Sequence, residues 1–192
     1  MRAPTPHATL SAARTAPAAV TPTTARTPTP MPTAVPTPVV SAAEIAALGT
    51  YFRAPIAGLA VGAIHDTFAE MRGSHRHEAT DIVEARATPV LAVADGTVAK
   101  LFTSAAGGLT LYEFSADGTW CFYYAHLDGY ADGMREGQTL HAGDVIGYVG
   151  TTGNAGATPH LHFAIFKLGP DRIWWQGTAI DPYPLLRAVA SP

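Results

Sequence analysis

Short apolar runs separated by glycines and Asp-Gly pairs fill the chain from residue 51 to about residue 187. The stretch TPVLAVADGTVAKLF, residues 88–102, predicts a strand, an Asp-Gly turn and a second strand, and residues 109–127 repeat this pattern. Asp-Gly between alternating apolar residues is a strong hairpin signal. No helical period longer than about two turns interrupts these runs. We therefore expect an all-β fold, a single compact domain of antiparallel sheets and hairpins that form an open cleft.

The first 40 residues have a different composition from the rest of the chain. They hold nine of the 16 prolines, are otherwise rich in Thr and Ala, and contain no Asp, Glu, Gly or aromatic residue. Such a segment cannot bury enough apolar surface to offset the entropy cost of ordering. The predicted organisation is a disordered tail (1–40), a short helix or linker (41–50), the folded domain (51–187) and a C-terminal tail (188–192).

The stretch SAAEIAALG, residues 41–49, predicts the short helix that precedes the domain. Ser41 is a candidate N-cap, and Glu44 follows three residues later, which is the spacing of a capping box. Gly49 is a candidate helix end. We expect this helix to dock on the β domain or to link the tail to it.

Charge and cysteine content exclude several classes of protein. The net charge is −3, and outside the tail nine basic residues face fifteen acidic ones. Domains that bind nucleic acid are normally basic, so no nucleic-acid partner is expected. The single cysteine, Cys121, excludes an internal disulfide and a Cys-based zinc finger. No apolar run is long enough for a transmembrane segment, and no signal-peptide pattern is evident.

Two histidines and an aspartate have a spacing that suits a metal ion. His77 and Asp81 are four residues apart, which brings both to one side of a strand or a helix. In PHLHF, His160 and His162 share one face of a predicted strand, and His162 is a candidate third ligand. Three imidazole or carboxylate ligands with one position left for water are typical of catalytic zinc, whereas structural zinc is usually closed by four ligands rich in Cys.

An aromatic strand, WCFYYAHL, supplies another histidine at residue 126. Strict alternation places Trp120 and His126 on one face, which suits the wall of a cleft, and Cys121 on the other. This arrangement argues against a Cys–His nucleophile pair and makes Cys121 a small buried hydrophobic residue.

Several other residues are candidates for substrate contacts. Arg72 and Asp66 lie just before the first predicted ligand, and Asn154 lies in the loop before PHLHF. Trp174 and Trp175 are expected to close the core, with stacking on a sugar or a peptide as the alternative.

Together these segments resemble the lysostaphin/LytM-type zinc endopeptidases, which cleave peptidoglycan peptides. The resemblance covers roughly residues 55–187 and follows the family's order: DTFAEMRGSHRHEATDI, ATPVLAVADGTV, YYAHL, EGQTLHAGDVIGYVGTTGNAG and PHLHF. Two positions depart from the family pattern, because Ala79 and Ala87 stand where glycine is common. Neither change removes a ligand.

The resemblance implies a role for five residues. His77, Asp81 and His162 would bind one Zn²⁺ per chain, while His126 and His160 would orient or activate water and stabilise the oxyanion. The glutamate of an HExxH motif is absent, so a histidine is the expected general base. Spacing does not decide between His126 and His160.

The predicted function is hydrolysis of peptide bonds in peptidoglycan cross-links or stem peptides, in the bacterial cell envelope (periplasm or extracellular). A peptidoglycan peptide is the expected partner. The alternative is a non-catalytic activator of cell-wall amidases, but such relatives lack zinc ligands and all five site residues are present here. A lipoyl-type carrier is disfavoured because Lys100 lies within a predicted strand and not at a hairpin tip.

Overall fold

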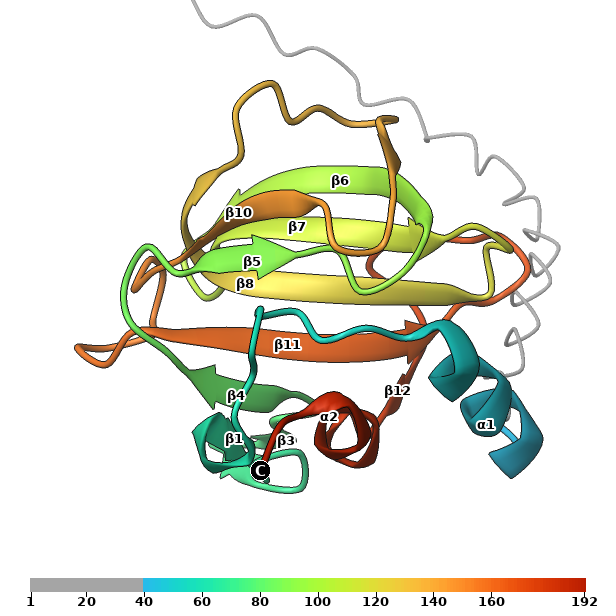
Figure 1. Ribbon diagram of the computed structural model, residues 1–192, viewed down its shortest axis with the longest axis horizontal. Helices are drawn as coiled ribbons and strands as arrows, with labels where there is room; N and C mark the ends of the chain where they lie inside the picture. The colour runs from blue at the N-terminus through green and yellow to red at the C-terminus, as the bar shows by residue number, and fades with distance from the viewer. Residues whose placement is uncertain (1–39) are drawn as a thin grey trace, which may run out of the picture. The chain divides into compact units, whose positions relative to one another are not determined.

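A computed structural model describes residues 40–192, and Figure 1 shows their arrangement. The predicted tail of residues 1–40 lies, apart from Val40, outside the described residues. The elements are, in chain order, α1 (Ala42–Tyr51), a 3-10 turn (Val61–Ala63), β1 (Ile64–His65), β2 (Met71–Arg72), β3 (His75–Arg76), β4 (Thr80–Val83), β5 (Pro89–Leu91), β6 (Gly96–Ser104), β7 (Gly108–Ser115), β8 (Trp120–Tyr130), β9 (Thr139–Leu140), β10 (Val145–Val149), β11 (His160–Lys167), β12 (Thr178–Ile180) and α2 (Tyr183–Val189).

One large antiparallel sheet dominates the domain and confirms the predicted β-rich class. Its strand order is β1-β4-β11-β8-β7-β6-β9, with β10 joining β5 to β8 and β12 pairing with β11. A separate two-stranded ribbon, β2–β3, precedes β4. Strand β8 is central, because it pairs with β7, β11 and β10.

The two predicted hairpins have different outcomes. The hairpin around Asp117-Gly118 is confirmed, since β7 and β8 pair directly across that turn and Gly118 has a φ of 67°. The hairpin around Asp95-Gly96 is wrong, because β5 pairs with β10 while β6 pairs with β7 and β9. The local signal marked a bend between β5 and β6, but pairing partners are chosen by burial across the whole sheet.

Helix α1 begins with the predicted capping box. The Ser41 hydroxyl accepts a hydrogen bond from the Glu44 backbone N–H, and the Glu44 carboxylate accepts one from the Ser41 backbone N–H. The prediction that the helix ends at Gly49 is wrong, because the helix continues to Tyr51. A Cβ added at Gly49 would lie 3.4 Å from the Leu185 side chain, so this glycine lies at a packing contact with α2. Within residues 40–192, neither helix is long and apolar enough to cross a membrane.

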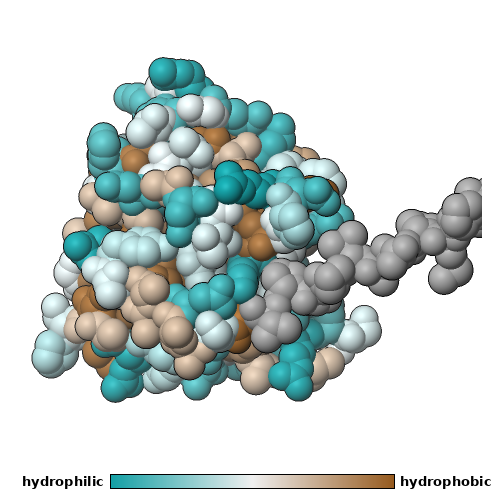
Figure 2. All heavy atoms as spheres, turned by 90° about the vertical axis from the view of Figure 1, so that its right-hand side faces the viewer, coloured by the Kyte–Doolittle hydropathy of each residue, from teal (hydrophilic) through white to brown (hydrophobic). Residues whose placement is uncertain are grey.

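The core joins the buried faces of the sheet, including residues of β5, β9 and β10, to both helices. Figure 1 shows the helices below β11, on the side away from β6 and β7. On β11, Leu161, Phe163 and Ile165 are fully buried, as predicted for the face opposite the histidines. Phe163 packs against Phe52 of the segment after α1 and Tyr124 of β8. On the side of the domain seen in Figure 2, apolar side chains are scattered among polar ones.

Ala87, where the related family commonly has glycine, adopts a φ of 67°. This left-handed conformation favours glycine and costs roughly 1 kcal/mol for a residue with a Cβ. The alanine is held there by a hydrogen bond from its N–H to the Val149 carbonyl (2.7 Å). The departure therefore places a residue with a Cβ in a strained position of this turn.

Candidate metal centre

The pairing register of three strands assembles the centre of the site. His162 on β11 lies directly opposite Asp81 on β4 and Ala125 on β8. Residues opposite one another in a sheet present their side chains to the same face. Asp81 and His162, 81 residues apart in the chain, are thus brought together by the sheet itself.

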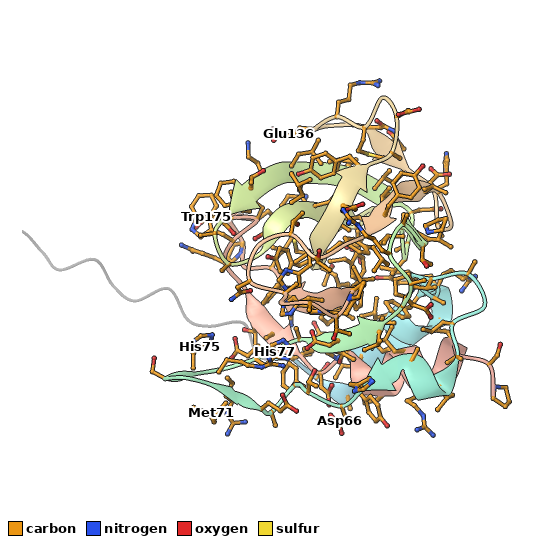
Figure 3. All side chains as sticks on the ribbon, turned by 90° about the vertical axis from the view of Figure 1, so that its left-hand side faces the viewer. Asp66, Met71, His75, His77, Glu136 and Trp175 are labelled. Carbon is orange, nitrogen blue, oxygen red and sulfur yellow. The ribbon has the colours of Figure 1, made fainter. Side chains whose placement is uncertain are left out.

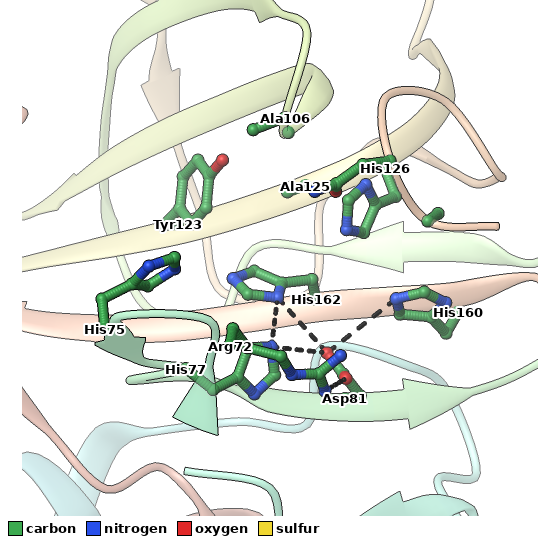
Figure 4. Close-up of a pocket in the computed structure, with 13 residues that line it drawn as sticks. Arg72, His75, His77, Asp81, Ala106, Tyr123, Ala125, His126, His160 and His162 are labelled. Carbon is green, nitrogen blue, oxygen red and sulfur yellow. Dashed lines mark hydrogen bonds and ion pairs between the residues drawn. The ribbon is translucent and has the colours of Figure 1, made fainter. Parts of the chain in front are cut away.

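The three predicted ligands form a compact triangle of donor atoms (Figure 4). His77 Nε2 lies 2.9 Å from His162 Nδ1, and Asp81 Oδ1 lies 3.3 Å from each of these nitrogens. Three ligands bound tetrahedrally at about 2.1 Å from a zinc ion would lie about 3.4 Å apart. Asp81 Oδ1 is buried and accepts no hydrogen bond from any described residue. An orphaned carboxylate oxygen beside two imidazole nitrogens fits a bound cation.

The protonation states also suit a metal ion. Burial would raise the pKa of Asp81, but its contacts with the His162 and His77 imidazoles hold that pKa well below its usual range. Burial lowers the pKa of His162 despite the nearby Asp81 carboxylate. The site therefore favours an anionic Asp81 and a neutral His162, the forms in which these groups bind metals.

Thr67 holds two of the ligands in place, and no sequence signal indicated it. Its backbone carbonyl accepts a hydrogen bond from His77 Nδ1 (3.2 Å), which leaves the Nε2 lone pair of the neutral ring directed at the triangle. Its hydroxyl accepts from the Asp81 backbone N–H (3.2 Å) and donates to the Ala79 carbonyl (3.3 Å). Such partners of ligating residues fix ring orientation and tune metal affinity.

His126 and His160 lie beside the triangle and are held in the same way. The Thr152 carbonyl accepts from His126 Nδ1 (2.8 Å), and the Thr158 carbonyl accepts from His160 Nδ1 (2.9 Å). In each neutral ring Nε2 is then the acceptor. The two ring centroids are 4.9 Å apart. Burial lowers the pKa of His126 to about 4, with the other histidines adding to the effect.

A bulge in β8 places His126 on the site face, which corrects the prediction from strict alternation. Tyr124 is opposite Leu111 and Leu127 is opposite Leu109, so two residues of β8 face a single residue of β7. His126 has a φ of 62°. The pairing of β8 with β11 ends at Ala125, and its pairing with β10 begins at Leu127. The His126 side chain therefore joins Ala125 at the pocket instead of following Tyr124 into the core.

These residues line one cavity of about 500 Å³. The predicted substrate-contact residues Arg72 and Asn154 lie on its wall, and Asp66 does not. The Arg72 guanidinium donates to Asp81 Oδ2 (3.1 Å), the carboxylate oxygen that faces away from the triangle. The complete lining is Arg72, His75, His77, Asp81, Ala106, Gly107, Tyr123, Ala125, His126, Asn154, Ala155, His160 and His162.

The tryptophans and the cysteine have separate outcomes. Trp175 is 62% exposed and Trp174 is half-buried, so the prediction that they close the core is wrong. Cys121 is buried, as predicted, and burial raises the pKa of its thiol. Its sulfur lies 3.8 Å from the Trp174 carbonyl oxygen. The burial of Cys121, and not strand alternation, therefore excludes a nucleophilic role for its thiol.

Two imidazoles and a carboxylate held together at the face of an antiparallel sheet, with a second pair of histidines beside them, are an arrangement typical of metal-dependent hydrolases. The family model described as Peptidase family M23 matches residues 75–182, more than half of the chain. The chain therefore belongs to peptidase family M23, a family of metallo-endopeptidases, which confirms the predicted resemblance.

Individual relatives agree with this assignment. The chain is 36% identical to an L-Ala–D-Glu endopeptidase of Bacillus subtilis, over 60% of this chain and 36% of that protein. It is 32% identical to the glycyl-glycine endopeptidase ALE-1 of Staphylococcus capitis, over 59% and 30% respectively. The chain thus spans about a third of the length of these relatives. The catalytic domain of lysostaphin from Staphylococcus simulans superposes with a TM-score of 0.55 and 27% identity, covering 65% of this chain and 91% of that one.

Proposed function

We propose that this chain is a zinc-dependent endopeptidase that hydrolyses peptide bonds in peptidoglycan cross-links or stem peptides. The observation that carries the proposal is the triangle of His77, Asp81 and His162, with its orphaned Asp81 oxygen. These residues would hold one Zn²⁺ per chain. The names of the relatives, an L-Ala–D-Glu endopeptidase and a glycyl-glycine endopeptidase, support a peptide substrate of this kind. A place in the bacterial cell envelope, periplasmic or extracellular, is part of the proposal.

Two histidines are equipped to move the protons of the reaction. Zinc supplies Lewis acidity and lowers the pKa of bound water to about 7. His126 and His160 each present a free Nε2 to the cavity, since Nδ1 of each ring donates to a backbone carbonyl. A neutral imidazole so oriented accepts a proton and later returns it to the leaving amine. His126, whose pKa burial lowers to about 4, is a weak base at neutral pH. His160 Nε2 lies 3.9 Å from Asp81 Oδ1, adjacent to the triangle but outside it.

Remaining pocket residues would position the substrate. Arg72 and Asn154 line the cavity, where a guanidinium and an amide suit the carbonyl and carboxylate groups of a peptide. Hydrogen bonding to such groups fixes the scissile bond near the metal. The alternative function, activation of an amidase without catalysis, needs no metal ligands, so the full set of five residues disfavours it.

Zinc content and turnover of two matched variants test this division of roles. His162→Ala should lose the metal, because it removes one of three ligands. His160→Ala should keep about one zinc per chain and lose turnover on the order of 10²- to 10⁴-fold, the usual contribution of general acid–base catalysis. Metal analysis and hydrolysis of purified peptidoglycan, before and after chelation, provide both readouts.

Loss of zinc in His160→Ala would contradict the assignment of His160 as a non-ligand. Wild-type protein without zinc that stimulates an amidase would overturn the enzymatic function altogether.

A further inference from the structure

A row of aromatic rings leads away from the metal centre along the same face of the sheet. The Tyr123 ring centroid lies 5.7 Å from that of His162, and the Tyr112 ring lies 4.6 Å from Tyr123. Tyr112 is 4.6 Å from Trp174, which in turn is 5.0 Å from Trp175. The row therefore connects a proposed metal ligand with an exposed tryptophan at the edge of the domain.

A second cavity of about 320 Å³ lies at the far end of this row. Trp174, Trp175, Tyr112 and Phe166 supply aromatic walls, and Tyr123 lines both this cavity and the metal pocket. In the view of Figure 3, Trp175 lies at the same edge of the molecule as His75 of the β2–β3 ribbon.

One charged group lines this second cavity, the carboxylate of Glu78. Glu78 follows the proposed ligand His77 directly and has a φ of 56°, and its N–H donates to the Phe68 carbonyl (3.0 Å). This left-handed backbone conformation lets Glu78 line the second cavity while His77 lines the metal pocket. No lysine or arginine is among the residues that line the cavity, so the carboxylate has no cationic partner there.

Aromatic faces and an unpaired carboxylate together attract a cation. Ring faces carry a negative quadrupole that binds ammonium groups, most strongly at tryptophan. A neutral sugar would stack on the rings and could donate hydroxyl hydrogen bonds to Glu78, but it would gain neither an ion pair with the carboxylate nor a cation–π contact with the rings. Charge complementarity thus selects an amine as the occupant.

The cavity lies within reach of a bound peptide. Phe166 is four residues from His162 along β11, a separation of about 13 Å at ~3.3 Å per residue. An extended peptide covers this distance in about four residues. A side chain a few positions from the cleaved bond would therefore enter the cavity.

We propose that Trp174, Trp175 and Glu78 form a subsite for a positively charged side-chain amine of the peptide substrate, such as that of lysine or another diamino acid. The assignment of this amine to a substrate rests on the proposed peptidase function. The affinity of the cavity for an amine does not depend on that function, and the test measures binding alone.

The probes are Nα-acetyl-lysine amide and its Nε-acetylated twin, which have the same backbone and differ in charge. Tryptophan fluorescence of the full-length protein reports their binding in a titration. We expect the free amine to bind about five- to tenfold more tightly than the twin. Trp175→Ala and Glu78→Gln should each reduce this preference below about twofold.

Two variants serve as matched controls. Tyr148→Ala removes an exposed aromatic ring on β10, and Asp132→Asn removes an exposed carboxylate, both away from the two cavities. Both should keep the wild-type preference, and circular dichroism checks that all four variants are folded. Equal binding of the twins to the wild type would overturn the proposal.

A second contrary outcome concerns sugars. If N-acetylglucosamine binds, Trp175→Ala abolishes that binding and the twins bind equally, the cavity is a sugar platform and the proposal is wrong. Failure of the proposed peptidase function would be recognised separately, because it appears as missing zinc or missing hydrolysis while the preference for the amine persists.

Discussion

Three threonine carbonyls set the direction of three site imidazoles. Thr67, Thr152 and Thr158 accept the Nδ1 hydrogen bonds of His77, His126 and His160, respectively. A carbonyl oxygen only accepts, so each neutral ring must carry its proton on Nδ1 and its lone pair on Nε2. The chemistry of the site therefore depends on backbone groups as much as on the histidines themselves.

Replacement of Thr67 by valine tests this supporting role. Valine keeps the shape of the side chain but loses the hydroxyl that accepts from the Asp81 N–H and donates to the Ala79 carbonyl. We expect zinc affinity to fall roughly tenfold, the lower end of the effect of such partners. Competition with a chromophoric chelator measures the affinity. Thr67→Ser should restore it, and unchanged affinity in Thr67→Val would show that the hydroxyl plays no part.

Strand β8 serves both the core and the site because it is irregular. Its bulge at Ala125 and His126 turns two consecutive side chains toward the pocket, while Tyr124 remains buried below. The Tyr124 hydroxyl donates to Glu113 of β7 (2.5 Å) and accepts from the Val93 N–H (3.1 Å). These bonds anchor β7 and β8 beneath the catalytic face, at the expense of burying a carboxyl group.

The buried Glu113 predicts a pH-dependent stability. Burial raises its pKa to about 8, although the hydrogen bond from Tyr124 opposes this, whereas an exposed glutamate titrates near 4.5. Between these values the folded chain holds a proton that the unfolded chain has released, so the free energy of unfolding falls as pH rises from about 5 to 8. At about 1.36 kcal/mol per pKa unit, the loss is on the order of 3–4 kcal/mol.

Glu113→Gln removes this titration and keeps the shape of the side chain. We expect the variant to have a flatter pH profile than the wild type and to gain relative stability near pH 8. Urea denaturation at pH 5, 6.5 and 8 measures the difference. Parallel profiles for the two proteins would show that Glu113 does not titrate in this range.

For the molecule as a whole, the proposed metal site joins distant parts of the chain. His77 lies after the β2–β3 ribbon, Asp81 lies on β4 and His162 lies on β11, so one ion would tie together segments 85 residues apart. An ion that binds only the folded state stabilises it by about 2.7 kcal/mol at a concentration 100 times its Kd. The metal is thus expected to contribute to stability as well as to catalysis.

Removal of zinc should therefore lower the melting temperature by about 5–10 °C, since each kcal/mol corresponds to roughly 2–4 °C in a domain of this size. Differential scanning calorimetry with excess zinc and with excess chelator measures the shift. The His162→Ala variant should show no difference between the two conditions. A shift of equal size in that variant would locate the stabilising zinc elsewhere.

Local sequence determined the elements and the chemistry of this protein. The capping box of α1, the Asp117-Gly118 hairpin and the apolar face of β11 depend on neighbouring residues, and periodicity and turn chemistry predict them. The donor types at His77, Asp81 and His162 likewise indicated a metal site. These features were predictable because the forces that produce them act over a few residues.

Only the tertiary structure decided how these parts meet. The bulge that turns His126 into the pocket, the pairing of β5 with β10 and the support from Thr67 all depend on contacts between segments far apart in the chain. The same holds for the aromatic row that ends at Trp175. Such contacts are selected by burial and hydrogen bonding across the assembled sheet, and no local pattern in the sequence encodes them.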